Sequence, residues 1–315
     1  MIRNAIFRKT FPSAALIAAL IIAPFSEAGI PIIDAHSQVD HKVDLKDMIP
    51  LMDKGGVSRV ILSPRSKLRR KAFMAFASRH PGRITPAVRT KSGIYRRNHP
   101  KYYRRLKKQL AMPQFGAMAE VILWHAQKGD KAPEVVIRIG EPQVQAALRA
   151  ALERKWPFIT HIEFAAAEFD RDEFMADLEG LMRRYPKHPF ALIHMGQLEA
   201  GEAARLIAAH PNVHFLTSHA NTVSVDASRQ PWVNMFTGDQ LAPAWKKLIV
   251  RHPDRFIMAF DNVWANDWGD FYLEQIALWR KALADLPPAV AKALAHGNAE
   301  RLWRLPPARW PSSKK

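Results

Sequence analysis

The chain has 315 residues and 48% of them are hydrophobic, which is enough to bury a full core in one large domain and excludes a disordered or fibrous protein. It contains no cysteine, so disulfides, thiolate metal ligands and cysteine nucleophiles are excluded. The formal net charge is +18, which points to acidic partners or anionic surfaces.

The chain begins with a predicted signal peptide. A stretch with three basic residues over 3–9 precedes an apolar run over 14–25, and a small-residue end follows at Ala28. This order of basic, apolar and small residues is typical of a secretory signal. We therefore predict a signal peptide over residues 1–28, cleaved after Ala28, and an exported, periplasmic protein. An uncleaved membrane anchor is the alternative.

Beyond the signal, short apolar runs alternate with longer amphipathic stretches, which predicts βα units around a parallel sheet. Eight alternations predict a (β/α)₈ TIM-type barrel as a single domain over 29–306, followed by a basic C-terminal tail over 307–315. A doubly wound open sheet has the same local pattern, but the first strand is followed by no Gly-rich phosphate fingerprint, which favours the barrel. The predicted strands are Ile30–His36, Arg59–Ser63, Ile84–Val88, Gly116–Leu123, Pro157–Ile162, Phe190–His194, Val213–Thr217 and Phe256–Phe260. The predicted helices are Leu45–Lys54, Lys67–Arg79, Tyr103–Ala111, Glu141–Lys155, Arg171–Arg184, Ala200–Ala209, Gln240–Arg251, Gly269–Ala284 and Pro288–Leu302.

Several predicted strands end in polar residues that an apolar core does not tolerate without a function. His36 and Gln38, two positions apart at the first strand, point to the same face of an extended chain. A barrel brings the carboxyl ends of its strands to one rim, so residues far apart in sequence are predicted to converge there. In chain order these residues are His36, Gln38, Glu120, His161, His194, His219 and Asp261.

This set of side chains predicts a catalytic metal site. Imidazole nitrogens and a carboxylate suit zinc and similar divalent ions, and a bound ion lowers the pKa of water toward about 7. Asp261 would accept the proton, and His194 or His219 would stabilise an oxyanion. Each residue alone has a structural alternative, since Asp261 could cap a helix and Glu120 could pair with an arginine. The segment 220–238, which carries Trp232, is long enough either to cover the rim or to pack over the last helices.

The charge is concentrated in one segment. Between Arg65 and Lys108 there are sixteen Lys or Arg residues and not one Asp or Glu. The segment predicts either a solvated basic face that contacts an anionic membrane surface or polymer, or a field that draws anionic substrates to a pocket. Nucleic acid is not expected as a partner of an exported chain whose basic segment has little aromatic interleaving. Arg89, at the end of the third strand, is a candidate to bind a substrate carboxylate through its planar fork.

The motifs at these strand ends resemble the amidohydrolase superfamily, and within it the amidohydrolase-related branch of decarboxylases and lactone hydrolases. The resemblance runs from about Ile30 to Leu305. It implies a divalent metal, zinc in the first place, held by the first-strand pair, the fifth-strand histidine and the eighth-strand aspartate. It also implies that the sixth-strand histidine binds substrate, acts as acid or base, or serves a second metal. The motifs are Asp34-Ala35-His36, His161, His194, Asp261 and the terminal Gly297-Asn298-Ala299-Glu300-Arg301-Leu302.

The sequence differs from the family pattern at Gln38, where the family has a second histidine. A glutamine oxygen is a harder and weaker zinc ligand than imidazole. Three interpretations follow: a metal-dependent enzyme with an altered site, a metal-free enzyme with Asp261 as base, and a periplasmic binding protein without catalysis. The leading prediction is hydrolysis of a C–N or C–O bond in a small, potentially anionic, molecule, and non-oxidative decarboxylation is its nearest rival. Neither the substrate nor the oligomeric state follows from these residues.

Overall fold

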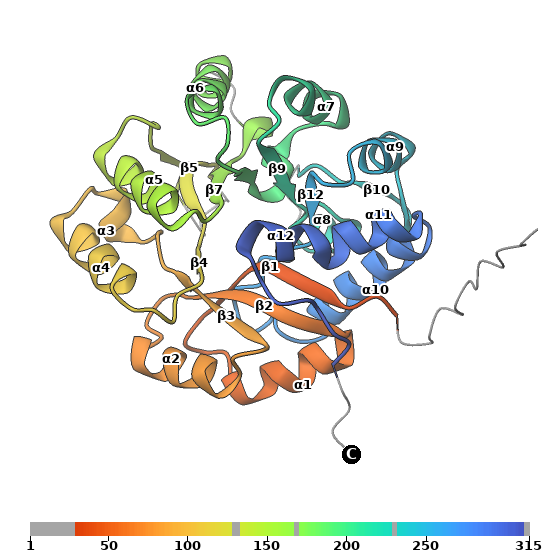
Figure 1. The fold of residues 1–315 in the computed structure, drawn as a ribbon, viewed down its shortest axis with the longest axis horizontal. Coiled ribbons are helices and arrows are strands. Elements are labelled where there is room, and N and C mark those ends of the chain that lie inside the picture. Colours follow the sequence, from red (N-terminus) through yellow and green to blue (C-terminus); the bar gives the residue numbers. More distant parts are fainter. Residues whose placement is uncertain (1–28, 128–132, 167–169, 229–231, 312–315) are drawn as a thin grey trace, which may run out of the picture.

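The computed structural model of the chain describes residues 29–127, 133–166, 170–228 and 232–311. The predicted signal peptide over 1–28 and residues 312–315 of the predicted tail lie outside the described residues. No helix in the described ranges is both long and apolar enough to cross a membrane. Strands and helices alternate along the chain as predicted, and Figure 1 shows the helices arranged around the central strands.

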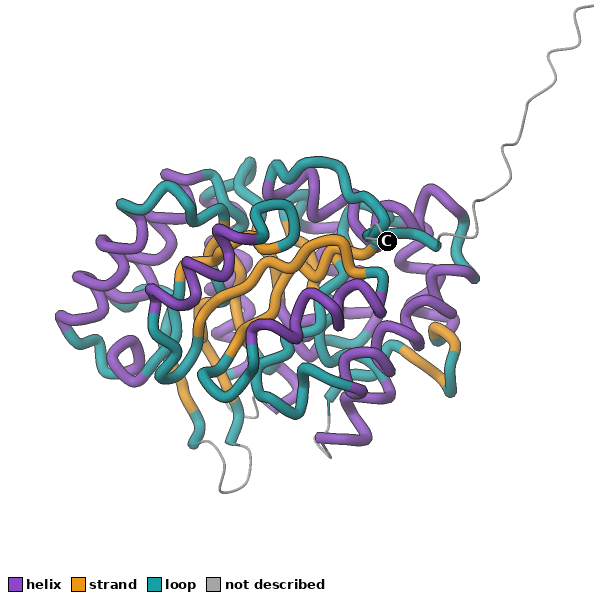
Figure 2. The backbone as a smooth tube through the Cα atoms, turned by 90° about the horizontal axis from the view of Figure 1, so that it is seen from below, coloured by secondary structure: helices purple, strands orange, loops and turns teal. Residues whose placement is uncertain are grey.

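The strands form two parallel sheets and one short hairpin. Both sheets lie in the middle of the molecule between layers of helices, as Figure 2 shows. All pairs in the two sheets are parallel except that between β5 and β6. The first sheet has the order β1 (Ile32–Val39), β2 (Val57–Pro64), β3 (Ile84–Val88) and β4 (Ala117–Met118). The second has the order β12 (Phe256–Ile257), β9 (Val213–Leu216), β8 (Phe190–Leu192), β7 (Phe158–Ile162), β5 (Val121–His125) and β6 (Val135–Val136), and the hairpin pairs β10 (Phe236–Thr237) with β11 (Gln240–Leu241).

The two sheets are connected on both sides. The predicted fourth strand, Gly116–Leu123, is interrupted at 119–120, so that β4 pairs with β3 while β5 pairs with β7. On the other side, the backbone N–H of Asp261 donates to the carbonyl oxygen of His36 at 2.8 Å, which joins β1 to the segment after β12. Within the two sheets the parallel strands therefore lie side by side in chain order, and a backbone hydrogen bond joins the first strand to the segment after the last.

The strands bury their two faces in two different hydrophobic clusters. Successive strand residues point to opposite sides, and one set of alternate residues packs against the helices in the larger cluster. The smaller cluster takes small and aliphatic side chains from every parallel strand except β5, and helix α12 (Asn298–Trp303) adds three residues to it. Its buried members are Ile33, Ala35, Ile61, Ala87, Ala117, Ala119, Ile159, Ala191, Ile193, Leu216, Ile257, Ala259, Ala299, Leu302 and Trp303.

The helices begin and end where local chemistry favours it. Asp44 caps α1 by accepting from the backbone N–H of Lys46, and Gly56 ends the helix with φ of 67°. The predicted helix over Gln240–Arg251 begins only at Pro243, because β11 uses its first residues and proline suits the first helical turn. The helices are α1 (Leu45–Gly55), α2 (Arg70–Arg79), α3 (Gly93–Arg96), α4 (Pro100–Leu110), α5 (Pro142–Arg154), α6 (Arg171–Arg184), α7 (Ala200–Ala209), α8 (Thr222–Ser228), α9 (Pro243–Arg251), α10 (Asp270–Ala284), α11 (Pro288–Lys292) and α12, with the short turns η1 (Phe164–Ala166), η2 (Ile193–Gln197) and η3 (Ala293–Gly297).

Candidate active site

The predicted site residues meet at one cavity of about 890 Å³. Two of them, His36 and Glu120, are almost completely buried and contact residues of the cavity wall. They come together because each lies toward the carboxyl end of a parallel strand or in the segment after it, and these ends lie at one rim. The predicted residues that line the cavity are Gln38, Arg89, His161, His194, His219 and Asp261.

Asp261, just after β12, has the most contacts with predicted site residues. Its Oδ1 accepts from Gln38 Nε2 at 2.8 Å and lies 3.3 Å from His36 Nε2. Its Oδ2 lies 3.6 Å from the Nε2 atoms of both His194 and His219. Burial raises the pKa of Asp261, but the facing imidazoles of His219 and His36 outweigh it and hold the pKa well below its usual value. The carboxylate is therefore ionised and surrounded by three histidines.

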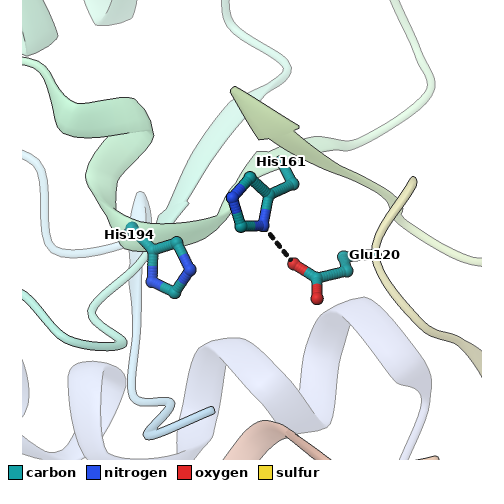
Figure 3. Close-up of side chains that lie close together, drawn as sticks. All are labelled: Glu120, His161 and His194. Carbon is teal, nitrogen blue, oxygen red and sulfur yellow. Dashed lines mark hydrogen bonds and ion pairs between the residues drawn. The ribbon is translucent and has the colours of Figure 1, made fainter. Parts of the chain in front are cut away.

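Glu120 lies in the interruption between β4 and β5 and is fully buried. Its Oε2 lies 2.8 Å from His161 Nδ1, the contact drawn as a dashed line in Figure 3. Its Oε1 accepts from Gln38 Nε2 at 3.2 Å and forms an ion pair with the Lys91 ammonium. The same oxygen is 3.7 Å from His36 Nε2. Glu120 thus connects His36 on β1 to His161 on β7.

Gln38 faces the two carboxylates with its nitrogen. Its Nε2 donates to Asp261 and Glu120, and its Oε1 accepts from Arg65 Nη1 at 3.3 Å. A guanidinium has only donors, so the contact with Arg65 favours this orientation of the amide. For Gln38 to bind a metal through its oxygen, as the family resemblance implies, the amide would have to turn over.

Both ring nitrogens of His161, at the end of β7, have carboxylate partners. Nδ1 faces Glu120, and Nε2 lies 3.0 Å from Glu163 Oε1. Glu163 is in turn held by the backbone N–H of Ala126 at 2.7 Å, and the His125 ring stacks on that of His161. Sequence analysis did not select Glu163, although its spacing of two from His161 on an extended chain is the signal that would have found it.

Three of the site residues have left-handed backbone conformations. The φ angles are 53° at His194, 56° at His219 and 53° at Asp261. Such conformations are rare for residues other than glycine, cost on the order of 1–3 kcal/mol each, and cluster at functional sites.

The aromatic rings of the site stack on one another. The His194 and His219 rings stack 4.8 Å apart, and the Trp232 ring lies 4.8 Å from that of His219. Trp232 thus contacts the rings of both histidines.

One group of ligand atoms fits a divalent cation. His36 Nε2 and carboxylate oxygens of Glu120 and Asp261 lie within 4.8 Å of one another. His36 Nε2 is buried and forms no hydrogen bond, which is uncommon for a buried polar atom. One imidazole and two carboxylates are a donor set that zinc and related ions accept. Neighbouring groups with the same spacing are Glu120, His161 and His194; His194, His219 and Asp261; and His125, His161 and Glu163.

Most of the sequence matches the model of a known protein family. Residues 25–305 match the family model described as amidohydrolase, which is most of the chain. The chain belongs to the amidohydrolase family. The predicted resemblance is thereby confirmed.

Solved structures share the fold of this amidohydrolase. An amidohydrolase from Burkholderia multivorans with bound zinc has a TM-score of 0.52 and 15% identity, over 88% of this chain and all of that one. An uncharacterised TIM-barrel protein from Bordetella bronchiseptica has a TM-score of 0.53 and 13% identity, over 83% of both chains. No protein of curated function matches the sequence. At these identities the likeness concerns the fold.

The amidohydrolase cavity has a basic wall, where β2 and β3 end. Arg65 and Arg89 follow these strands, and Lys91 and Arg96 come shortly after Arg89 in the sequence. Burial, together with the nearby positive charges of Arg105 and Arg65, lowers the pKa of Arg89 to about 10. Sequence analysis selected Arg89 but neither Arg65 nor Lys91, because no pattern separates them from the other basic residues of their segment.

Proposed function

We propose that this amidohydrolase is an exported, metal-dependent hydrolase that cleaves a C–N or C–O bond of a small molecule in the cavity. The observation that carries the proposal is the buried, ionised Asp261, which faces three histidine rings at the cavity wall. Family membership supports a hydrolase. Export is supported by the basic, apolar and small order of residues 1–28.

His36, Glu120 and Asp261 would hold the divalent cation. The family resemblance implies His161 and Gln38 as further ligands, and Gln38 could serve only after its amide turns over, because its nitrogen faces the two carboxylates. Zinc is proposed because the Burkholderia multivorans amidohydrolase holds zinc. When bound, such an ion polarises a carbonyl group and lowers the pKa of water. The closed (β/α)₈ barrel that we propose for the whole domain keeps these side chains on different strands at fixed separations.

The surrounding residues supply the proton transfers. Asp261 Oδ2 accepts the proton of the attacking water, because the carboxylate is ionised. His194 Nδ1 donates to the carbonyl oxygen of Ser218 at 3.1 Å, so its Nε2 carries the lone pair and is 3.6 Å from Asp261. His194 Nε2 takes this proton from Asp261 Oδ2 and gives it to the leaving nitrogen or oxygen. His219, beside it, donates from Nε2 to the oxyanion.

One observation favours a second candidate, the same hydrolysis without a metal. The Gln38 amide and the Lys91 ammonium already donate to the carboxylates that would hold the ion. In that case Asp261 acts as base and Lys91 balances the charge of Glu120. The two candidates differ in whether chelation removes activity.

The proposal is tested on a panel of lactones, esters and amides, with hydrolysis followed by acid release. Loss of a general base typically costs 10²- to 10⁴-fold in rate, so Asp261→Asn and His161→Ala are expected to lower kcat/KM by at least about 10²-fold. His252→Ala, at the end of α9 and outside the cavity lining, is the matched control and should keep full activity. Full turnover by His161→Ala refutes the proposed site. Release of CO₂ from a second panel, of aromatic and unsaturated carboxylic acids, in place of hydrolysis identifies a decarboxylase.

A further inference from the structure

Three arginines line one wall of the cavity. Arg65 follows β2, Arg89 follows β3 and Arg96 ends α3. Within the described residues, none of the three guanidinium groups has a carboxylate oxygen within ion-pair distance. Cations in a partly enclosed site are usually paired, since the loss of hydration must be balanced. The wall thus presents three cations that no carboxylate of the described residues contacts directly, although Asp261, Asp40 and Asp267 attract Arg65 from a longer distance.

Arg89 is the most constrained of the three. Its guanidinium donates to the backbone carbonyl oxygens of Ser66 at 3.0 Å and Lys91 at 3.3 Å. Burial, together with repulsion from Arg105 and Arg65, lowers its pKa to about 10. Two neutral carbonyls hold the side chain in place without cancelling its charge.

Arg65 links the wall to the reacting centre. It donates to Gln38 Oε1 at 3.3 Å, and Gln38 contacts both Asp261 and Glu120. Its guanidinium also lies over the Trp264 ring, 4.8 Å from the centroid, which orients the fork. An anionic group at this wall therefore lies within a short distance of Asp261.

We propose that Arg65, Arg89 and Arg96 form the subsite for an oxyanion group of the substrate, a carboxylate or a phosphate, so that the substrate is a small acid. Planar guanidinium forks match both groups through paired N–H donors. The inference rests on the proposed function, because it takes the cavity as the place where the substrate binds. The anion at the wall places the scissile bond toward Asp261 and the histidines.

The competing explanation is the general field of the basic segment 65–108. A field acts through total charge and is screened by salt, whereas a subsite depends on particular side chains. Arg104 separates the two explanations. It lies on α4, is exposed and does not line the cavity, so Arg104→Gln removes the same charge from the same segment.

The test is direct binding by calorimetry at physiological salt, with benzoate and its neutral isostere benzamide as probes. A hydrogen-bonded charge pair typically contributes enough for about a tenfold change in affinity or more. We expect benzoate to bind at least about tenfold more tightly than benzamide. Arg89→Gln and the exposed Arg96→Gln should weaken benzoate by a similar factor, Arg89→Lys should weaken it less, and Arg104→Gln should leave it unchanged.

Equal binding of benzoate and benzamide, no binding of benzoate, or equal loss in Arg104→Gln and Arg89→Gln overturns the inference. Inorganic phosphate is the second probe. If it competes with benzoate, the subsite accepts phosphate groups as well; if it does not, the anion is a carboxylate. Thermal unfolding of each variant checks that it folds.

The binding measurement also separates this inference from the proposed function, because it needs neither metal nor turnover. Arg89-dependent benzoate binding in a chain that hydrolyses nothing on the panel refutes the hydrolase and leaves the subsite. If the protein hydrolyses neutral and acidic substrates equally well and Arg89→Gln has no effect, the proposed hydrolase function stands and the anion subsite is refuted.

Discussion

Asp34 is a buried acid behind the site whose ionisation should be visible in stability. Its Oδ1 accepts from the backbone N–H groups of His36 and Phe260, and its Oδ2 accepts from Ser37 Oγ at 2.6 Å and from the Tyr272 hydroxyl at 3.3 Å. Burial, which outweighs these hydrogen bonds, raises the pKa of Asp34 from 3.8 to about 7. The residue therefore holds a proton in the folded protein that it loses on unfolding at neutral pH.

The difference between the folded and unfolded pKa of Asp34 sets the direction and size of the change in stability with pH. Between the unfolded pKa of 3.8 and the folded pKa of about 7, the native state binds more protons than the unfolded state, so stability falls as pH rises through this window. Each pH unit below the folded pKa corresponds to about 1.4 kcal/mol, and little more is lost above it. The two units from pH 5 to about pH 7 therefore set a loss of about 3 kcal/mol between pH 5 and pH 8. Asp34→Asn removes the titration but keeps an acceptor for both backbone N–H groups.

The assay is urea unfolding of the two proteins at pH 5 and pH 8. The wild type should lose about 3 kcal/mol more of its unfolding free energy than Asp34→Asn between the two pH values. Asp285→Asn, which changes an exposed acid, is the control and should follow the wild type. An equal pH dependence in the wild type and Asp34→Asn would refute the raised pKa and the buried environment that causes it.

Two further predictions concern the carboxylates of the site. Gln38→Glu places a third carboxylate where the amide donates to Glu120 and Asp261. The unfolding free energy of this variant in chelator should therefore fall by about 3–5 kcal/mol, and it should recover when Zn²⁺ is added. A variant as stable as the wild type in chelator contradicts this prediction. The pKa of Asp261 is depressed, so its stabilisation is present above its unfolded pKa of 3.8 and is lost as pH falls toward the folded pKa. Circular dichroism should therefore show that acidification below pH 4 destabilises the wild type more than Asp261→Asn, and parallel acid unfolding curves would contradict it.

The fold is largely predictable because hydrophobic periodicity is a local property. Runs such as Phe190–Leu192 and Val213–Leu216 are apolar over the length of a buried strand, and both are strands in the structure. The break of the predicted fourth strand at 119–120 was not predictable, since Ala119 and Glu120 carry no turn signal. It depends on Glu120 reaching His161 on the next strand, a tertiary contact.

The sequence predicts which residues form the site, but not their backbone conformations or side-chain orientations. Strand-end position selected His36, His161, His194 and Asp261, and the structure places them around one cavity. The left-handed backbone at three site residues has no sequence signal, because such conformations normally call for glycine. The orientation of Gln38 likewise depends on Arg65, which is twenty-seven positions away in the chain.

Metal content tests the central claim most directly. Purified mature protein and its Asp261→Ala variant are compared by elemental analysis, with Asp285→Ala as the control for loss of an exposed carboxylate. We expect about one equivalent of divalent metal in the wild type and in Asp285→Ala, and its loss in Asp261→Ala. Wild-type protein that is metal-free and resists reconstitution contradicts the metal-dependent hydrolase.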